Sequence, residues 1–288
     1  EEIIMEYATL NTGARMPMLG FGVFQVTDLM QCKQIVLDAI DVGYRLFDTA
    51  AVYGNEAAVG EAIAEAIAMG KVKREDLFIT SKLWVQDMNA YDVDEGIDQS
   101  LRNLGLEYID LYLLHQAMGD YFSAWRGLEQ AYRDGRLMDI GVSNFYPDRL
   151  VDFILNNEVV PAVNQVETHP FNQQVKANEI MKEYGVQIES WGPFAEGKNG
   201  IFTNEILSKI GKKYNKSVAQ VVLRWLIQRN IIAIPKSTRK DRIEENFNVF
   251  DFELSVEDMN KIAELDRKES LFLNHDDVEI VKWLNGRK

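Results

Sequence analysis

Four side chains that could together donate a proton occur at the ends of neighbouring apolar segments. Asp48 ends one such segment and Tyr53 lies five positions later, while Lys82 and His115 end the next two. A tyrosine is a poor acid at neutral pH, since its ordinary pKa is about 10. A lysine ammonium beside the phenol oxygen would stabilise the phenolate and lower the pKa of the tyrosine. These residue types therefore predict a site for acid–base chemistry.

The aspartate and the histidine make this set suited to carbonyl reduction. An aspartate next to the lysine would keep it charged and oriented, and a neutral histidine could bind the substrate oxygen. Reduction of a carbonyl requires these functions, because hydride reaches the carbon while a proton must reach the developing alkoxide. Taken singly, each residue has a structural explanation: a turn cap, packing, a solvated lysine or a core histidine. Their coincidence at the ends of successive segments favours catalysis.

The segments that must position these residues alternate between strand and helix patterns. The chain opens with a predicted β-hairpin over residues 7–18, with its turn at 11–13. Short apolar runs then alternate with amphipathic helical stretches. The predicted strands are 19–22, 45–48, 78–81, 109–115, 140–143, 162–165, 187–191 and 231–234. The predicted helices are 30–42, 56–69, 93–104, 121–133, one that begins at Pro147, 175–184, 204–214, 218–229 and 239–246.

Strand–helix units in strict alternation, without a long linker, indicate a (β/α)8 TIM barrel. The main alternative, an open doubly wound sheet, would usually carry Gly-x-Gly-x-x-Gly after its first strand. The chain has Gly20-Phe21-Gly22 there, with Gln25 at the third glycine position. We therefore predict an α/β fold with a single barrel domain over residues 1–288, an N-terminal hairpin, and a C-terminal tail and loops over the active-site face. Chemistry in barrels sits at the C-terminal ends of the strands, so the four residues should face one mouth.

Composition narrows the class of protein. The chain has 288 residues, 47% of them hydrophobic, and a single cysteine, Cys32, which excludes an internal disulfide. A net charge of −14 argues against binding to nucleic acid or to an anionic membrane. No apolar run approaches the ~20 residues of a spanning helix, and the N-terminus lacks a signal-peptide core. We expect a cytoplasmic monomer that starts naturally at Met5. Since His169 and His275 give no metal spacing with His115, we expect no metal.

The four residues and their surroundings resemble the aldo-keto reductase superfamily. The local forms Phe47-Asp48-Thr49-Ala50 and Tyr53-Gly54-Asn55-Glu56 match its catalytic motifs, and the resemblance extends through Gly141-Val142-Ser143-Asn144-Phe145 to the C-terminal helix. The chain looks most similar to small prokaryotic members, such as 2,5-diketogluconate reductases, and to prostaglandin F synthases of protozoa. The resemblance implies reduction of aldehydes or ketones to alcohols, with Tyr53 as the general acid, Lys82 and Asp48 tuning it, and His115 orienting the carbonyl.

A basic cluster after the eighth predicted strand could hold a phosphate. Helix N-terminal N–H groups would assist the side chains there. The resemblance makes this the site of the adenosine 2′-phosphate, with Glu245 and Asn246 near adenine, so the cofactor would be NADPH/NADP+ rather than NADH. The phosphate-binding residues would be Lys236, Ser237, Thr238 and Arg242.

Other strand ends offer contacts to a nicotinamide and to a substrate. Ser143, Asn144 and Gln165 supply the donors and acceptors that a carboxamide needs, and the resemblance places Trp191 in a stack with the ring. Further candidate cofactor contacts are Gly22, Val23 and Phe194. The candidate substrate-binding residues are Trp84, His115 and Gln116.

The chain departs from the family pattern beside the histidine. Many members have Trp-Pro after it, whereas this chain has Gln116-Ala117, so the substrate, a small-molecule carbonyl, does not follow from better-known members. Residues 270–288 could cover the pocket or pack on the barrel. Two rival functions remain open: a cofactor-retaining redox sensor with negligible turnover, and a Schiff-base lyase that uses Lys82. An aspartate that keeps the lysine protonated argues against the second.

Overall fold

The computed structural model describes residues 4–287. Its N-terminal hairpin pairs β1 (Tyr7–Thr9) with β2 (Arg15–Pro17) antiparallel, as the sequence predicted. Gly13 has a φ of 89° in the turn, a conformation that favours glycine. The Asn11 side chain donates to the Pro161 carbonyl, 3.1 Å away, so the hairpin is tied to the N-terminal end of the barrel.

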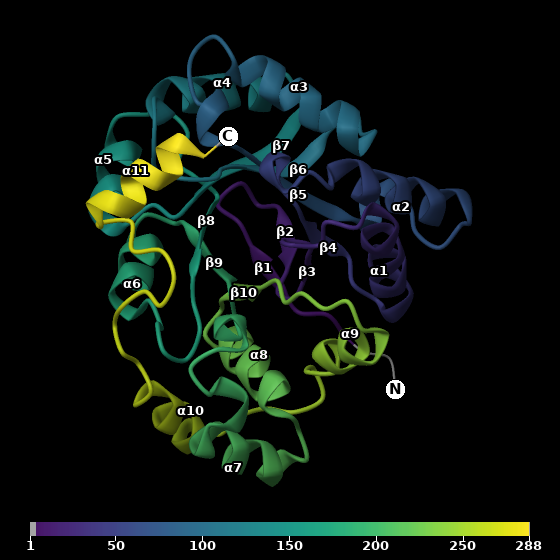
Figure 1. Ribbon diagram of the computed structural model, residues 1–288, viewed down its shortest axis with the longest axis vertical. Helices are drawn as coiled ribbons and strands as arrows, with labels where there is room; N and C mark the ends of the chain where they lie inside the picture. The colour runs from purple at the N-terminus through teal and green to yellow at the C-terminus, as the bar shows by residue number, and fades with distance from the viewer. Residues whose placement is uncertain (1–3, 288) are drawn as a thin grey trace.

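Eight parallel strands form the barrel wall in the order β10-β9-β8-β7-β6-β5-β4-β3 (Figure 1). The ends of this order meet in a parallel bridge between Leu19 and Ala233, and the Gly20 N–H donates to the Ala233 carbonyl at 2.8 Å. The sheet therefore closes, which confirms the predicted (β/α)8 fold. The strands are β3 (Phe21–Gly22), β4 (Leu46–Asp48), β5 (Phe78–Leu83), β6 (Ile109–Leu114), β7 (Leu137–Ser143), β8 (Val163–Glu167), β9 (Gln187–Trp191) and β10 (Ile232–Ala233).

Helices cover the outside of this wall (Figure 1). Their starts carry local signals: the Asp28 side chain accepts from the Gln31 N–H, and Pro147 occupies the first turn of its helix. They are α1 (Leu29–Val42), α2 (Glu56–Ala68), α3 (Val93–Leu104), α4 (Tyr121–Arg133), α5 (Pro147–Leu155), α6 (Val175–Glu183), α7 (Glu205–Tyr214), α8 (Val218–Gln228), α9 (Lys240–Phe247), α10 (Val256–Ala263) and α11 (Val278–Gly286). Within residues 4–287, no helix combines the length and apolar character that crossing a bilayer takes.

The glycines of Gly20-Phe21-Gly22 serve packing within the barrel. A Cβ on Gly20 would lie 2.4 Å from the Leu46 Cγ, and one on Gly22 would lie 3.0 Å from the Ile234 carbonyl oxygen. Glycine therefore lets β3 approach its neighbours on both sides. This explains a glycine pair that, without its third member, did not fit a dinucleotide loop.

One predicted strand boundary was wrong and one helix was missed, each for an identifiable reason. The strand β7 begins at Leu137 rather than residue 140, because Asp139, which interrupts the apolar pattern, is buried and accepts a hydrogen bond from the Thr12 hydroxyl at 2.5 Å. The helix α10 was not predicted. Ser255 and Asp258 form a capping box at its start, a signal that was present in the sequence.

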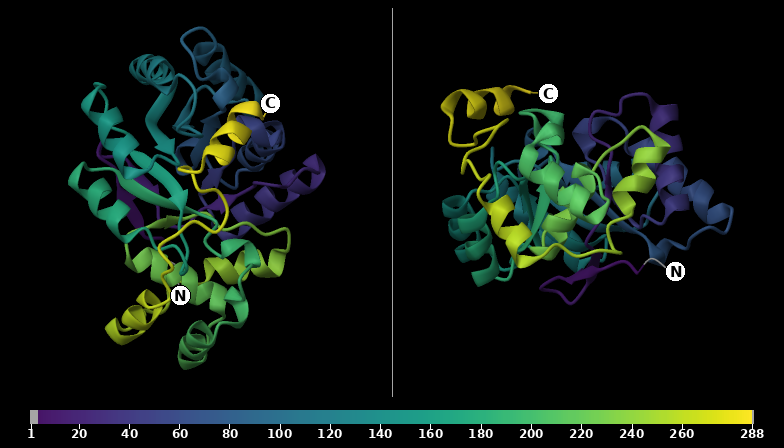
Figure 2. Two further views of the ribbon diagram at one scale, coloured as in Figure 1. Left: turned by 60° about the vertical axis from the view of Figure 1, so that its left-hand side comes forward. Right: turned by 90° about the horizontal axis from the view of Figure 1, so that it is seen from below.

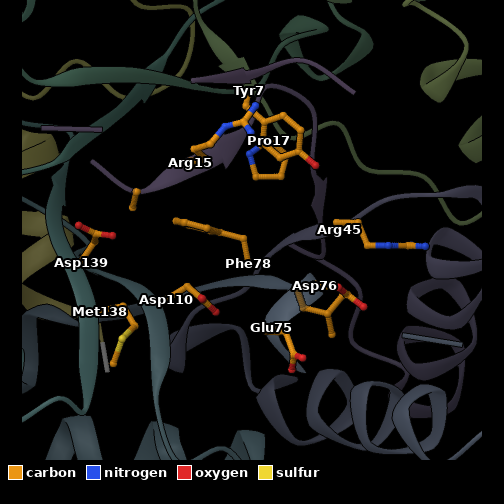
Figure 3. A pocket seen from close by; sticks show the side chains of 12 residues that line it. Tyr7, Arg15, Pro17, Arg45, Glu75, Asp76, Phe78, Asp110, Met138 and Asp139 are labelled. Carbon is orange, nitrogen blue, oxygen red and sulfur yellow. The ribbon is translucent and has the colours of Figure 1, made fainter. Parts of the chain in front are cut away.

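The N-terminal end of the barrel contains a cavity of about 630 Å³ beneath the hairpin. Figure 3 shows Asp110 and Asp139 at the strand ends, with Tyr7 and Arg15 of the hairpin across from them. Burial raises the pKa of Asp139 to about 6, and the hydrogen bond from Thr12 only partly opposes this. A carboxyl that holds its proton more tightly in the folded than in the unfolded chain stabilises the fold below about pH 4. That contribution is lost as the pH rises through about 6.

We therefore expect Asp139→Asn to stabilise the protein in neutral and alkaline solution. The asparagine oxygen still accepts from Thr12, but no charge is buried at high pH. The melting temperature should rise by roughly 2 °C at pH 8 and change little at pH 4.5. Calorimetry at both pH values checks this, and a gain that is equal or larger at pH 4.5 would contradict it.

Candidate active site

The barrel mouth brings together the four residues whose types indicated acid–base chemistry. Asp48 ends β4 and Lys82 lies near the end of β5, the adjacent strand. Tyr53 ends the 3-10 turn that follows β4, and His115 comes directly after β6. The C-terminal ends of three consecutive strands therefore converge on one point, as the barrel topology requires.

The Lys82 ammonium is the centre of this group. Its Nζ lies 2.5 Å from Asp48 Oδ1, 3.0 Å from the Thr49 carbonyl oxygen and 3.2 Å from the Tyr53 hydroxyl. An ammonium has three hydrogens, so these contacts use all of its donors. Burial alone would lower the pKa of Lys82, which is fully buried, but Asp48 and Tyr53 raise the pKa above its ordinary value. The lysine is therefore charged at neutral pH and is a poor nucleophile, which argues against a Schiff-base lyase.

Lys82 lowers the pKa of Tyr53, as expected, but this effect does not decide the net shift. Removal of the phenol from solvent raises the pKa of Tyr53 above its ordinary value, and the opposing effect of Lys82 is smaller than that of burial. The phenol is thus kept protonated well beyond neutral pH. Once it gives up its proton, the phenolate has an ammonium at hydrogen-bond distance. This combination suits a proton donor better than a permanent phenolate would.

His115 presents a neutral imidazole to the same point. Burial, followed by the charge of Lys82, lowers the pKa of His115 well below its ordinary value. Its ring lies edge-on to Tyr53, with 5.6 Å between the ring centroids, and edge-on to Trp84 at 5.1 Å. Among the described residues, no partner reaches its buried Nδ1. Nε2 is therefore the nitrogen left to meet the oxygen of a bound molecule.

Polar residues on β7 and β8 form a second wall of the site. The Gln165 amide donates to Asp48 Oδ2 at 2.8 Å, and the Ser143 hydroxyl donates to the Gln165 carbonyl at 2.8 Å. The Trp191 indole N–H donates to Asn144 Oδ1, also at 2.8 Å. Asn144 has a φ of 62°, which places its side chain across the strand ends. These bonds hold a half-buried indole and several amide groups in fixed positions beside Asp48 and Lys82.

A basic group of residues lies further along the same cleft, between β10 and α9. The Lys236 ammonium donates to Gln25 Oε1 at 2.9 Å, and Ser237 and Arg242 line the cleft beside it. The N-terminus of α9 follows directly, and the positive end of a helix dipole favours an anion. In a chain with a net charge of −14, this local cluster suits a phosphate.

One cleft of about 1370 Å³ joins these parts. Most of the residues that the sequence nominated line it, except Val23, Lys82 and Thr238. Val23 is buried, and it interacts through its carbonyl oxygen with Asn55. Lining residues that sequence reasoning missed include Phe24, Gln25, Arg239, Leu273 and Arg287. The nominated residues that line the cleft are Gly22, Asp48, Tyr53, Trp84, His115, Gln116, Ser143, Asn144, Gln165, Trp191, Phe194, Lys236, Ser237, Arg242, Glu245 and Asn246.

The C-terminal tail lines the cleft together with Trp84 and Gln116. Figure 2 shows α11 at the end of the barrel opposite the hairpin. Trp84 packs with Leu284, and its indole N–H donates to the Arg287 carbonyl at 2.8 Å. Gln116 bonds the His275 ring at 2.6 Å. Two of the residues that the sequence nominated for substrate binding, Trp84 and Gln116, are therefore fixed by the tail.

Comparison with known proteins identifies the chain. An α/β barrel with ionisable side chains at its mouth is typical of barrel enzymes. Residues 18–267 match the model of the Aldo/keto reductase family. An uncharacterised oxidoreductase of Bacillus subtilis is 48% identical over 90% of this chain and 92% of its own. A glyoxal reductase of the same species is 44% identical over 93% of this chain and 96% of its own. The chain belongs to the aldo/keto reductase family and is an oxidoreductase.

A solved structure agrees with this assignment. The aldo-keto reductase of Bombyx mori, crystallised in complex with NADP, superimposes with a TM-score of 0.91. It is 35% identical to this chain, and the alignment covers 98% of both chains. The likeness therefore extends from the barrel to the loops and the tail that shape the cleft.

The buried ion pair predicts a large stability effect. Lys82→Met leaves the Asp48 carboxylate buried without its cation, so the free energy of unfolding should fall by about 3–5 kcal/mol. Urea unfolding followed by fluorescence measures this. Asp48→Asn combined with Lys82→Met removes both charges and should lose less than Lys82→Met alone. Equal losses in the single and the double variant would contradict a charge effect.

Proposed function

We propose that the protein reduces aldehydes and ketones to alcohols with NADPH, using Tyr53 as the general acid. The observation that carries this proposal is the contact of the Lys82 ammonium with both Asp48 Oδ1 and the Tyr53 hydroxyl. A protonated phenol with a cation already in place can give up its proton when negative charge develops on a nearby oxygen. Bound NADPH would supply the hydride that generates this charge.

Each of the other residues has a part in the proposed reaction. His115 binds the carbonyl oxygen through Nε2 as a neutral donor and places that oxygen near the Tyr53 hydroxyl. Lys82 stabilises the phenolate that remains after the proton has left, and Asp48 keeps Lys82 charged. Trp84 and the tail exclude water from this point, which strengthens these electrostatic interactions.

The cofactor would lie along the cleft from β9 to α9. Trp191 offers an indole face held by Asn144, and the amides of Asn144 and Gln165 suit a carboxamide. Lys236, Ser237 and Arg242 suit a phosphate that NADPH carries and NADH lacks. The NADP complex of the Bombyx mori relative supports this choice of cofactor.

The substrates would be small carbonyl compounds. A relative that is 44% identical is a glyoxal reductase, so short 2-oxoaldehydes are the first compounds to assay. Trp84, Gln116 and Leu273 line the cleft, and the Trp84 ring lies edge-on to His115. An apolar wall with few polar groups suits a short carbonyl chain.

Removal of the Tyr53 hydroxyl tests the acid. Tyr53→Phe should lower kcat for NADPH-linked reduction about 10²–10⁴-fold, because a positioned acid contributes that much. The assay follows NADPH absorbance with methylglyoxal and a panel of other aldehydes. NADPH binding, measured by fluorescence, should remain. A Tyr53→Phe protein with full activity would contradict the assignment of Tyr53 as the general acid.

Removal of the basic residues tests the choice of cofactor. Lys236→Met and Arg242→Met should each raise the Kd for NADPH roughly 10–100-fold, the value of a charge-assisted hydrogen bond. The Kd for NADH should stay constant in both. Lys240→Met is the matched control, because Lys240 is exposed on α9, the helix that carries Arg242, but does not line the cleft. Equal losses for the two nucleotides would argue against a site for the 2′-phosphate.

A further inference from the structure

Glu189 is a buried acid that the proposed reaction does not use. It lies on β9, two residues before Trp191 on the same side of the strand, and is completely buried. Its direct cross-strand partner on β8 is Gln165. Glu189 was not nominated from the sequence, because it lies within a strand and not at its end. An acid inside the strand Gln187-Ile188-Glu189-Ser190-Trp191 was nevertheless a signal, since buried carboxyl groups are rare.

The Gln165 amide connects Glu189 to the catalytic group. Its Nε2 donates to Glu189 Oε1 at 2.5 Å and to Asp48 Oδ2 at 2.8 Å, so both amide hydrogens are used. The reversed amide would set its oxygen against the Asp48 carboxylate. Glu189 and Asp48 therefore fix Gln165 in one orientation, with the amide oxygen left as an acceptor.

The surroundings of Glu189 favour its neutral form. Among the described residues its Oε2 is buried with no hydrogen-bond partner, so a charge there would lack a donor. Lys82 favours the charged form of Glu189 only through space, and less strongly than burial opposes it, since its three hydrogens go to Asp48, Thr49 and Tyr53. On the other side of Glu189, β10 contributes Ile232 and Ala233, which are apolar.

From this arrangement we propose that Glu189 is a positioning residue of the active site. As a neutral acid it holds the Gln165 amide against Asp48, and on losing its proton it places a second negative charge near Lys82 and Tyr53. Burial, followed by the charge of Asp48, raises the pKa of Glu189 to about 8. The charge of ionised Glu189 in turn raises the pKa of Tyr53. Glu189 would thus extend to higher pH the range in which Tyr53 keeps its proton.

Two variants separate the hydrogen bond from the charge. Glu189→Gln keeps an oxygen that can accept from Gln165 but never ionises, whereas Glu189→Leu removes both properties. Asp139→Asn is the matched control, because it also replaces a buried carboxyl by an amide but lies at the opposite end of the barrel.

The first measurement needs no turnover. In the unliganded wild-type protein, the infrared band of a protonated carboxyl should be present at pH 7 and disappear with a midpoint near pH 8. Glu189→Gln should lack this transition and Asp139→Asn should keep it. A wild-type protein without it, or a Glu189→Gln protein that retains it, would overturn the proposal.

The second measurement is the pH profile of kcat/KM, and it rests on the proposed reductase function. The alkaline limb of Glu189→Gln should lie at least about half a pH unit below that of the wild type and of Asp139→Asn. Glu189→Leu should also bind NADPH several-fold more weakly than Glu189→Gln, because Gln165 loses its anchor. Unshifted limbs in an active Glu189→Gln enzyme reject the role of Glu189. Absence of NADPH-linked reduction in the wild type rejects the proposed function instead, and the infrared titration then decides the Glu189 proposal.

Discussion

The structure of the candidate active site depends on one buried ammonium. Lys82 is removed from solvent, which by itself would favour loss of its proton, yet three oxygen atoms surround its three donors. Any displacement of Asp48 or Tyr53 would leave a charge or a phenol unpaired in the barrel. The parallel pairing of β4 and β5 keeps these distances constant, since it sets the two strand ends side by side. The barrel therefore keeps Lys82 charged, although burial by itself would favour the neutral amine.

A second constraint follows from the acidity of the chain. With a net charge of −14, the protein must concentrate positive charge wherever an anion is to bind. Lys236, Arg239 and Arg242 line one part of the cleft, where Arg239 pairs with Asp241. Lys236 donates to a neutral partner, Gln25, so its charge is available to attract a bound anion.

The sequence predicted the barrel well because its signals are periodic. Alternating apolar runs and helical stretches define the strand–helix units. Because all strands of the barrel run in the same direction, their last residues lie at one mouth. Asp48, Tyr53, Lys82 and His115 could be nominated for this reason. The tail contacts of Trp84 and Gln116 could not, because they join positions about 160–200 residues apart. Asp139 shows the other limit: a buried polar residue interrupts the pattern, and its partner Thr12 is distant in sequence.

Glu189 belongs with these residues that periodicity cannot interpret. Alternation along β9 places Glu189 and Trp191 on one side of the strand; Trp191 lines the cleft, whereas Glu189 is fully buried next to Gln165. Whether such an acid is charged depends on the donors that other strands bring to it. Here Lys82 has none to spare, and Gln165 gives only one hydrogen to each carboxyl. Glu189 therefore favours its neutral form because the hydrogen-bond donors of its neighbours are already used by other acceptors. The same contacts that place an ammonium beside the Tyr53 hydroxyl would keep Glu189 neutral.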